Sequence, residues 1–324
     1  MGSSDYNEMV YKSRIDTAKK TKTDVFVHSA AIRSGTVKTA VHKSLDPAGL
    51  NKAGINVRES FDSKEHPESF PIVVGFDITG SMSRVPRIFI EKFPSLMAAL
   101  LKKGYIKHPQ ILFAAIGDAT CDRVPLQIGQ FEAGNEMDEA LANIYLEAGG
   151  GGQQTESYEL FKYFMARHTD LDSMNKRNKK GICFIIGDEM PYSHVKKHEV
   201  ERVIGDTLEA NIPVKTILKE LKEKFEVIWI LPAGTNNYND STVNKYLKDM
   251  FGQDFYKLDN PENICEFLIG KIGLYQGFDI EGIKADLEEL GSSKAAIESV
   301  VKSLAIKPKK KSKAAVVGDS VERL

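Results

Sequence analysis

The sequence predicts an α/β fold, with a doubly wound, mostly parallel sheet flanked by helices. The first observation is a set of short β-branched apolar runs without alternation, such as PIVVGFD at 71–77, which is typical of strands buried on both faces. The second is that segments of helical periodicity alternate with these runs from residue 71 to residue 275. The third is that several of the runs end in polar, acidic loops, where open α/β sheets place their ligands.

The composition is that of a globular protein and argues against nucleic-acid-coating and membrane-spanning proteins. The chain has 324 residues, is 42% hydrophobic and carries a formal charge of −1, which is typical of a globular protein and argues against one that coats nucleic acid. Its three cysteines, Cys121, Cys183 and Cys265, lie far apart, so we expect a reducing compartment and no disulfide framework. The N-terminus shows no secretory pattern, and the apolar runs are far shorter than the roughly 20 residues of a membrane helix. We therefore expect a cytoplasmic protein without a membrane partner.

The first 70 residues differ in texture from the rest of the chain. They are polar, broken by Gly and Pro, and poor in periodicity. We interpret residues 1–70 as an N-terminal extension that wraps the main domain or a partner, and intrinsic flexibility remains the alternative. Val25–His28 is the best candidate for a strand within it.

The main domain is expected over residues 71–275. Strands are predicted at 71–77, 111–118, 124–131, 181–189, 227–234 and 254–259. Helices are predicted at 85–104, 135–148, 156–168, 214–225, 242–251 and 261–275. Pro94 should either kink the first of these helices or mark its first turn after a break.

A helical addition follows the main domain. Residues 276–306 read as a helical pair that turns at Gly291-Ser292, and the lysine-rich tail 307–324 is expected to be disordered.

The loop after the first strand is the strongest candidate for chemistry. Asp77, Thr79 and Ser81 alternate in D-I-T-G-S, so three side-chain oxygens can turn inward, and Gly80 permits the turn. Carboxylate and hydroxyl oxygens are the ligands that Mg²⁺ prefers. The alternative interpretation is that these residues only form an Asx turn and cap the next helix.

Two further loops add polar groups at the same predicted edge of the sheet. Asp188 and Glu189 follow the strand at 181–189, and Thr155, Glu156 and Ser157 follow a run of four glycines. Because parallel strands end at the same edge, we expect these loops to meet the first one.

The D-x-T-G-S-M motif after a buried strand resembles the metal-ion-dependent adhesion site of von Willebrand factor A domains, whose usual form is D-x-S-x-S. The resemblance covers Pro71 to Tyr275. It implies that Thr155, from a second loop, and Asp188, from a third, complete the site, although Glu156 or Ser157 could replace Thr155. The chain departs from the family pattern where Thr79 replaces the first Ser and where the third loop reads G-D-E instead of T-D-G.

The resemblance implies a binding module and not an enzyme. Such domains hold one divalent cation, here Mg²⁺ or Mn²⁺, with one open position that an Asp or Glu of a partner protein fills. The metal ligands that it implies are Asp77, Thr79, Ser81, Thr155 and Asp188. Intracellular relatives act in multi-protein assemblies, for example with AAA+ ATPases of the MoxR type. The motifs RESFDSKEHPESFPI and GDATCDRVPLQIGQFE resemble a bacterial and tailed-phage group of such proteins, which implies the host cytoplasm if the chain is phage-encoded.

Two other functions remain open. A metal-dependent hydrolase or phosphotransferase could use Asp77, Asp118, Asp122, Asp188 and Glu189 to hold two metals and activate water. No His or other general base stands beside them, which favours binding. An RNA-binding protein is suggested by a resemblance to the Ro autoantigen and by the lysine tail, but the near-neutral charge and the lack of a helical-repeat domain argue against it.

Overall fold

The structure is a computed structural model that describes residues 4–38, 41–51, 53–147, 152 and 154–305. Of Ser81 it describes the backbone only. The predicted disordered tail at 307–324 lies outside the described residues, as does most of the glycine run that precedes Thr155.

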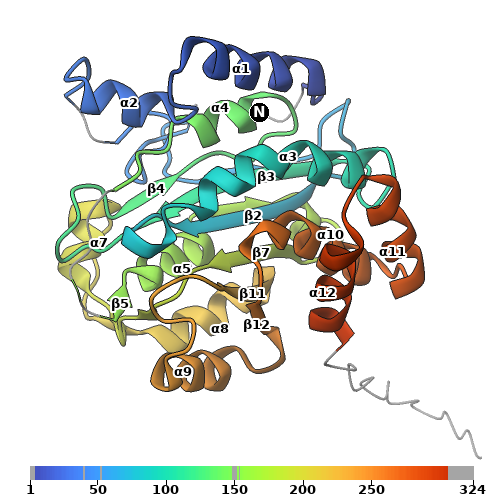
Figure 1. Ribbon diagram of the computed structural model, residues 1–324. Coiled ribbons are helices and arrows are strands. Elements are labelled where there is room, and N and C mark those ends of the chain that lie inside the picture. Colours follow the sequence, from blue (N-terminus) through green and yellow to red (C-terminus); the bar gives the residue numbers. More distant parts are fainter. Residues whose placement is uncertain (1–3, 39–40, 52, 148–151, 153, 306–324) are drawn as a thin grey trace, which may run out of the picture.

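The centre of the fold is a six-stranded sheet (Figure 1). In spatial order its strands are β12 (Phe255–Leu258), β11 (Phe225–Pro232), β7 (Gly181–Ile186), β2 (Phe70–Asp77), β3 (Pro109–Ile116) and β4 (Leu126–Ile128). All neighbouring pairs are parallel except β3 and β4, which are antiparallel. The predicted doubly wound, mostly parallel α/β sheet is confirmed.

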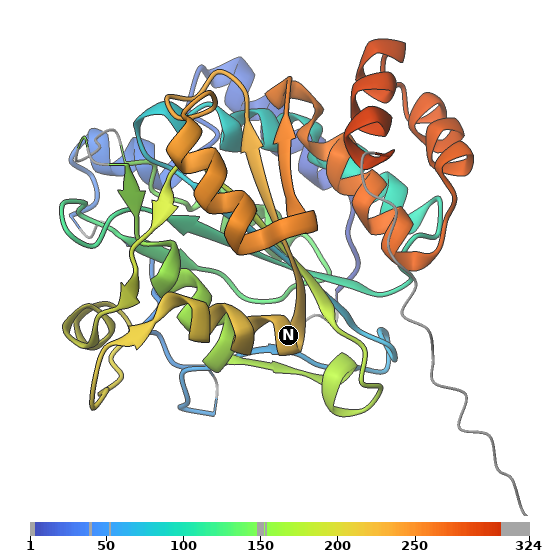
Figure 2. The same cartoon turned by 90° about the horizontal axis from the view of Figure 1, so that it is seen from below.

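Helices cover both faces of the sheet because successive side chains of a strand point to opposite faces. In β2, Ile72, Val74 and Phe76 belong to one apolar core with helices α3, α10, α11 and α12, whereas Val73 belongs to a second core with α5, α7, α8 and α9. Figure 2 shows α8 and α9 lying across the second face. Every residue of β2 is buried, as the unbroken apolar run predicts.

The remaining elements connect and cover these strands. The helices are α1 (Glu8–Thr21), α2 (Val27–Arg33), α3 (Val85–Leu101), α4 (Glu136–Ala142), α5 (Tyr158–Arg167), α6 (Asp172–Asn175), α7 (Lys197–Val203), α8 (Val214–Lys224), α9 (Ser241–Phe251), α10 (Ile264–Gln276), α11 (Ile280–Glu289) and α12 (Lys294–Ala305). The short strands are β1 (Arg58–Ser60), β5 (Thr155–Glu156), β6 (Thr169–Leu171), β8 (Met190–Pro191), β9 (His194–Val195) and β10 (Ile212–Pro213). Three 3₁₀ turns are η1 (Gly80–Met82), η2 (Gly252–Asp254) and η3 (Pro261–Asn263).

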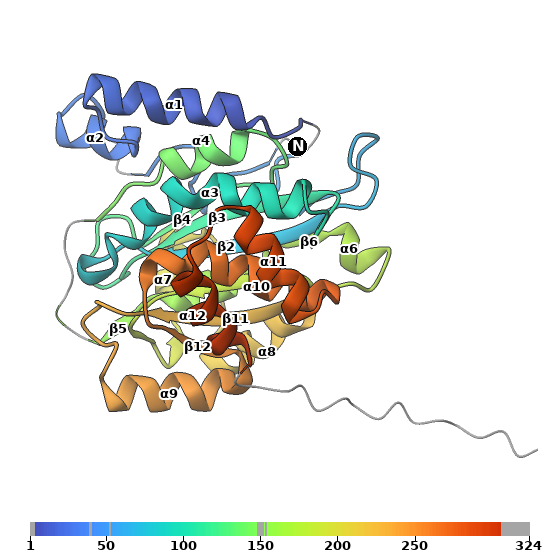
Figure 3. The ribbon, with the colours of Figure 1, turned by 45° about the vertical axis from the view of Figure 1, so that its right-hand side comes forward.

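The described part of the first 70 residues packs on the sheet domain. Helix α1 lies above α4 and α3 (Figure 3), and the side chains of Tyr11, Phe26 and Leu45 are buried in the same core as α3. The hydroxyl of Tyr11 donates a hydrogen bond to the carbonyl of Ile90 in α3. This segment therefore buries apolar surface of its own against the domain.

Two local predictions differ from the structure. The strand predicted at Val25–His28 is wrong, because the Asp24 carboxylate accepts the backbone N–H of Phe26 (3.0 Å) and turns the chain into α2. The helix predicted at 135–148 ends at Ala142. Beyond it the side chain of Gln127 exchanges two 2.8 Å hydrogen bonds with the backbone of Tyr145, which holds that stretch extended.

Three further features concern helix α3, the length of the apolar helices and the cysteines. Helix α3 is one element with Pro94 in its interior, so Pro94 does not mark a first turn. Among the described residues no helix is long and apolar enough to cross a membrane. The three cysteines form no disulfide, as predicted.

Close packing between β2 and α5 generates a testable prediction. A Cβ atom added at Gly75 would lie 2.9 Å from a ring carbon of Phe161 and 3.2 Å from Cδ1 of Ile116. We expect Gly75→Val to lower the free energy of unfolding by about 1–3 kcal/mol, because overpacking forces the core apart. Urea denaturation measures the change.

The matched control is Gly282→Ala in α11, where the nearest atom to an added Cβ lies at 3.4 Å. That variant should be as stable as the parent or more stable by up to about 1 kcal/mol, since Ala favours helix over Gly. A Gly75→Val protein as stable as the parent would contradict the close approach of α5 to the sheet.

Candidate metal site

The loops singled out by the sequence come together at one edge of the sheet. Strands β2, β3 and β7 are adjacent and parallel, so the residues that follow their carboxyl ends lie side by side. The side chains of Asp77, Asp118 and Asp188, one after each strand, are fully buried. This edge is therefore the candidate site.

Asp77 is held by donors on both carboxylate oxygens. Its Oδ1 accepts the backbone N–H of Thr79 at 2.9 Å and the Thr79 hydroxyl at 2.7 Å. Its Oδ2 accepts the hydroxyl of Tyr158, the first residue of α5, at 2.5 Å. A carboxylate offers about four acceptor positions, so these three bonds orient Asp77 and, among the described residues, leave one position, on Oδ2.

The alternative interpretation of this loop, an Asx turn that caps the next helix, agrees with the structure in part. The bond from the Thr79 N–H to Asp77 is an Asx turn. Thr79 stands at the N-terminus of η1 (Gly80–Met82), but its side chain makes no capping hydrogen bond to that turn. The side chain of Ser81 lies outside the described part of the structure, so its predicted role as a ligand stays a prediction.

Asp188 lies directly after β7 and across from Asp77. Its Oδ2 accepts the backbone N–H of Asn237 at 3.2 Å. The preceding Gly187 allows close approach of α5, since an added Cβ would lie 2.1 Å from the Tyr158 hydroxyl oxygen. The G-D-E sequence of this loop thus leaves the space that Tyr158 occupies when it binds Asp77.

The second loop is fixed against the third by a two-residue parallel bridge. Thr155 and Glu156 form β5, which pairs with Met190 and Pro191 of β8. Glu156 is 2% exposed and Thr155 is partly buried. The hydroxyl oxygen of Ser157 accepts the backbone N–H of Ala119 at 2.9 Å, which ties this loop to the loop after β3.

The loop after β3 contributes a third set of contacts. The Oδ2 atom of Asp118 accepts the hydroxyl of Tyr192 at 2.9 Å, and its Oδ1 accepts the N–H of Thr120 at 2.8 Å. The Oδ2 atom of Asp122 accepts the N–H of Asp118 at 2.6 Å. Asp118 is thereby oriented by the third loop, because Tyr192 follows β8.

Burial and mutual repulsion dominate the electrostatics of the site. Burial, followed by the charges of Asp77 and Glu189, raises the pKa of Glu156 to about 10. Burial, followed by Asp77 and Asp188, raises the pKa of Glu189 to about 8. Burial is also the main cause that raises the pKa of Asp77 to about 7, although the bond from Tyr158 opposes it. The carboxylates are close enough to disfavour one another's charge.

Three residues of the site were not predicted from the sequence. These are Tyr158, Tyr192 and Asn237. They donate hydrogen bonds to the three buried aspartates, and for Asn237 the donor is the backbone. Tyr158 directly follows the predicted second loop, so its position in the sequence indicated that it lies near the site. Neither Tyr192 nor Asn237 belongs to a motif that indicates this role.

The acidic edge offers oxygen atoms that could coordinate a cation. In the described part of the chain, no three His, Cys, Asp or Glu side chains form a preassembled metal group. Mg²⁺ retains several waters and needs only one or two protein carboxylates. Asp77 and Asp188, with the hydroxyl of Thr79, supply such a set, and a cation would offset the repulsion among the buried carboxylates. Oxygen ligands of these types are the ones that Mg²⁺ and Mn²⁺ prefer.

Comparisons with known proteins give a distant likeness of shape. No protein-family model matches the sequence, and no curated protein matches it. Two structures of the pilus adhesin SpaC from Lactobacillus rhamnosus GG are similar to 69% and 65% of the chain, each with 10% sequence identity. Their TM-scores are 0.46, for the open conformation, and 0.44. The chain spans 31% of the length of either adhesin chain.

The raised pKa of Glu156 generates a prediction about pH. Its unfolded-state value is near 4.5 and its folded-state value is about 10, so the folded protein binds the extra proton between these limits. Stability of the metal-free protein should therefore fall as the pH rises from 5 to 8. In Glu156→Gln the loss of unfolding free energy per pH unit should be smaller than in the parent, by up to about 1.4 kcal/mol. Urea denaturation at several pH values, with a chelator present, measures this difference.

The matched control is Glu298→Gln, since Glu298 lies on the exposed face of α12. That variant should keep the pH slope of the parent. If Glu156→Gln also keeps the parent slope, Glu156 does not hold its proton in the folded protein, and the electrostatic account of the site is wrong.

Proposed function

We propose that this protein is a metal-dependent protein-binding module that holds one divalent cation at the carboxyl edge of its sheet and captures an acidic side chain of a partner. The observation that carries the proposal is the burial of Asp77 and Asp188 at the ends of two adjacent strands, where burial and neighbouring carboxylates are the main causes that raise the pKa values of Asp77, Glu156 and Glu189. An acidic edge of this kind attracts a cation.

The residues that would hold the cation are those of the resemblance to von Willebrand factor A domains. Asp77 and Asp188 would supply negative charge, and the hydroxyls of Thr79, Ser81 and Thr155 would supply neutral oxygens. When bound, the cation supplies positive charge at an otherwise acidic edge, so that a carboxylate of a partner protein is attracted instead of repelled. Tyr158 orients Asp77 for this role.

A metal-dependent hydrolase is the second candidate, and one observation favours it. Glu156 and Glu189 each have a buried carboxylate oxygen, Oε2, with no hydrogen-bond partner among the described residues. These oxygens exceed what a single Mg²⁺ needs and could serve a second ion. Two ions about 4 Å apart would indicate hydrolysis, whereas one ion indicates binding.

The setting of the module is part of the proposal. Three cysteines that form no disulfide support a reducing compartment, here the cytoplasm, or the host cytoplasm if the chain is phage-encoded. We expect the partner to be a component of an intracellular assembly, such as an AAA+ ATPase, and to offer an Asp or Glu. The proposal includes neither a membrane nor a nucleic acid.

Calorimetric titration of Mg²⁺ and Mn²⁺ into the chelator-treated protein tests the proposal. We expect one saturable site, and we expect Asp188→Asn to weaken it at least tenfold, because a neutral amide replaces one of two carboxylate ligands. The matched control is Asp249→Asn on α9, where the carboxylate is 65% exposed and pairs with Lys245. Binding in that control should equal that of the parent.

Either of two results would count against the proposal. Absence of any saturable binding would remove the cation from the account, and equal binding by Asp188→Asn and Asp249→Asn would place the ion elsewhere. A stoichiometry of two ions would favour the hydrolase.

A further inference from the structure

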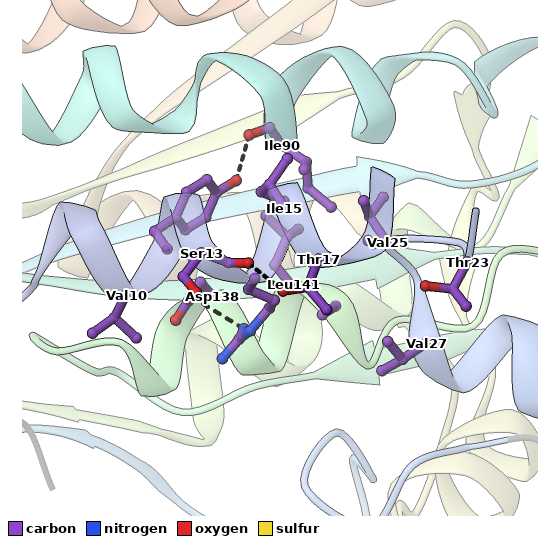
Figure 4. Close-up of a pocket in the computed structure, with 14 residues that line it drawn as sticks. Val10, Ser13, Ile15, Thr17, Thr23, Val25, Val27, Ile90, Asp138 and Leu141 are labelled. Carbon is purple, nitrogen blue, oxygen red and sulfur yellow. Dashed lines mark hydrogen bonds and ion pairs between the residues drawn. The ribbon is translucent and has the colours of Figure 1, made fainter. Parts of the chain in front are cut away.

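A cavity that shares no lining residue with the acidic edge lies beneath α1. It has a volume of about 380 Å³ and is lined by α1, the segment after it, α3 and α4 (Figure 4). Most of its walls are aliphatic, as with Ile15, Val25, Ile90 and Leu141. A mostly apolar cavity of this size with few polar groups is typical of small-molecule sites.

The charged groups of the cavity are one ion pair with unused hydrogen-bonding capacity, and the hydroxyl residues Ser13, Thr17 and Thr23 also line it. Asp138 of α4 has a side chain that is 1% exposed, and its Oδ2 lies 3.1 Å from Nη1 of Arg14 in α1. Despite this distance the pair lacks hydrogen-bond geometry. Both carboxylate oxygens of Asp138 and Nη1 of Arg14 are buried without a hydrogen-bond partner among the described residues.

A buried hydrogen-bond acceptor and a buried donor that lack partners lower the stability of the folded protein, because neither regains the bonds that it made to water. The carboxylate of Asp138 is shielded from water, and this burial raises its pKa to about 6 against the opposing charge of Arg14. A hydroxyl group both donates and accepts, so it can bond to Asp138 and accept from Arg14 at the same time.

We propose that this cavity binds a small apolar alcohol or phenol, whose hydroxyl bonds to Asp138 and Arg14 while its hydrocarbon body contacts the aliphatic walls. A purely apolar molecule of the same shape would leave both polar groups unpaired and would bind more weakly. A ligand with an ionised head would upset the balance of charge between the two side chains. This site is independent of the proposed metal site.

The test compares p-cresol with toluene, which has the same shape apart from the hydroxyl. Binding to the full chain is followed by NMR of isotope-labelled methyl groups. We expect p-cresol to bind at least tenfold more tightly than toluene and to shift the methyl signals of Ile15, Val25 and Leu141. Ala142→Phe, which fills the cavity from α4, should abolish binding of both.

The decisive variant is Asp138→Leu, which replaces the carboxylate by an apolar group. Arg14 is 30% exposed and can turn to solvent in that variant. We expect it to keep toluene binding, which also shows that it is folded, and to lose the preference for p-cresol to within about twofold. The proposal is overturned if neither compound binds the parent up to its solubility, if the shifted methyl groups lie elsewhere, or if Asp138→Leu keeps the preference.

Discussion

Repulsion among buried carboxylates at the carboxyl edge of the sheet is the constraint on which the rest of the site depends. Asp77 and Asp188 end adjacent strands, and Glu156 and Glu189 are brought beside them by the pairing of β5 with β8. Burial first, and then the charges of neighbouring carboxylates, raise the pKa values of Asp77, Glu156 and Glu189. The fold holds these groups together at a cost in stability, which is common where a site is built for a ligand.

The surrounding core explains how the fold tolerates this crowding. Tyr158 reaches Asp77 from α5 because Gly187 leaves room for its ring, and the indole N–H of Trp229 donates to the Gly187 carbonyl at 3.0 Å. These aromatic groups connect β7, β11 and α5 directly beneath the acidic edge. The orientation of Asp77 is therefore set by the packing of the whole second face and not by its own loop alone.

The sequence was sufficient for the sheet and for the meeting of the candidate loops at one edge of it, but not for the contacts among those loops. Continuous apolar runs predicted the central strands, because burial on both faces leaves a pattern that is local in the chain. The bonds from Tyr158 and Tyr192 depend on side chains that meet only after folding. The strand predicted at Val25–His28 failed because a single Asx turn at Asp24 outweighed the β-branched composition. The metal ligands themselves stay predictions.

A crystal structure of the protein grown with Mn²⁺, with the ion located by its anomalous scattering, tests the central claim most directly. The account predicts one peak at the carboxyl edge, within ligand or water-bridged distance of both Asp77 and Asp188. A single peak elsewhere, or an acidic edge that stays empty at saturating Mn²⁺, would contradict it.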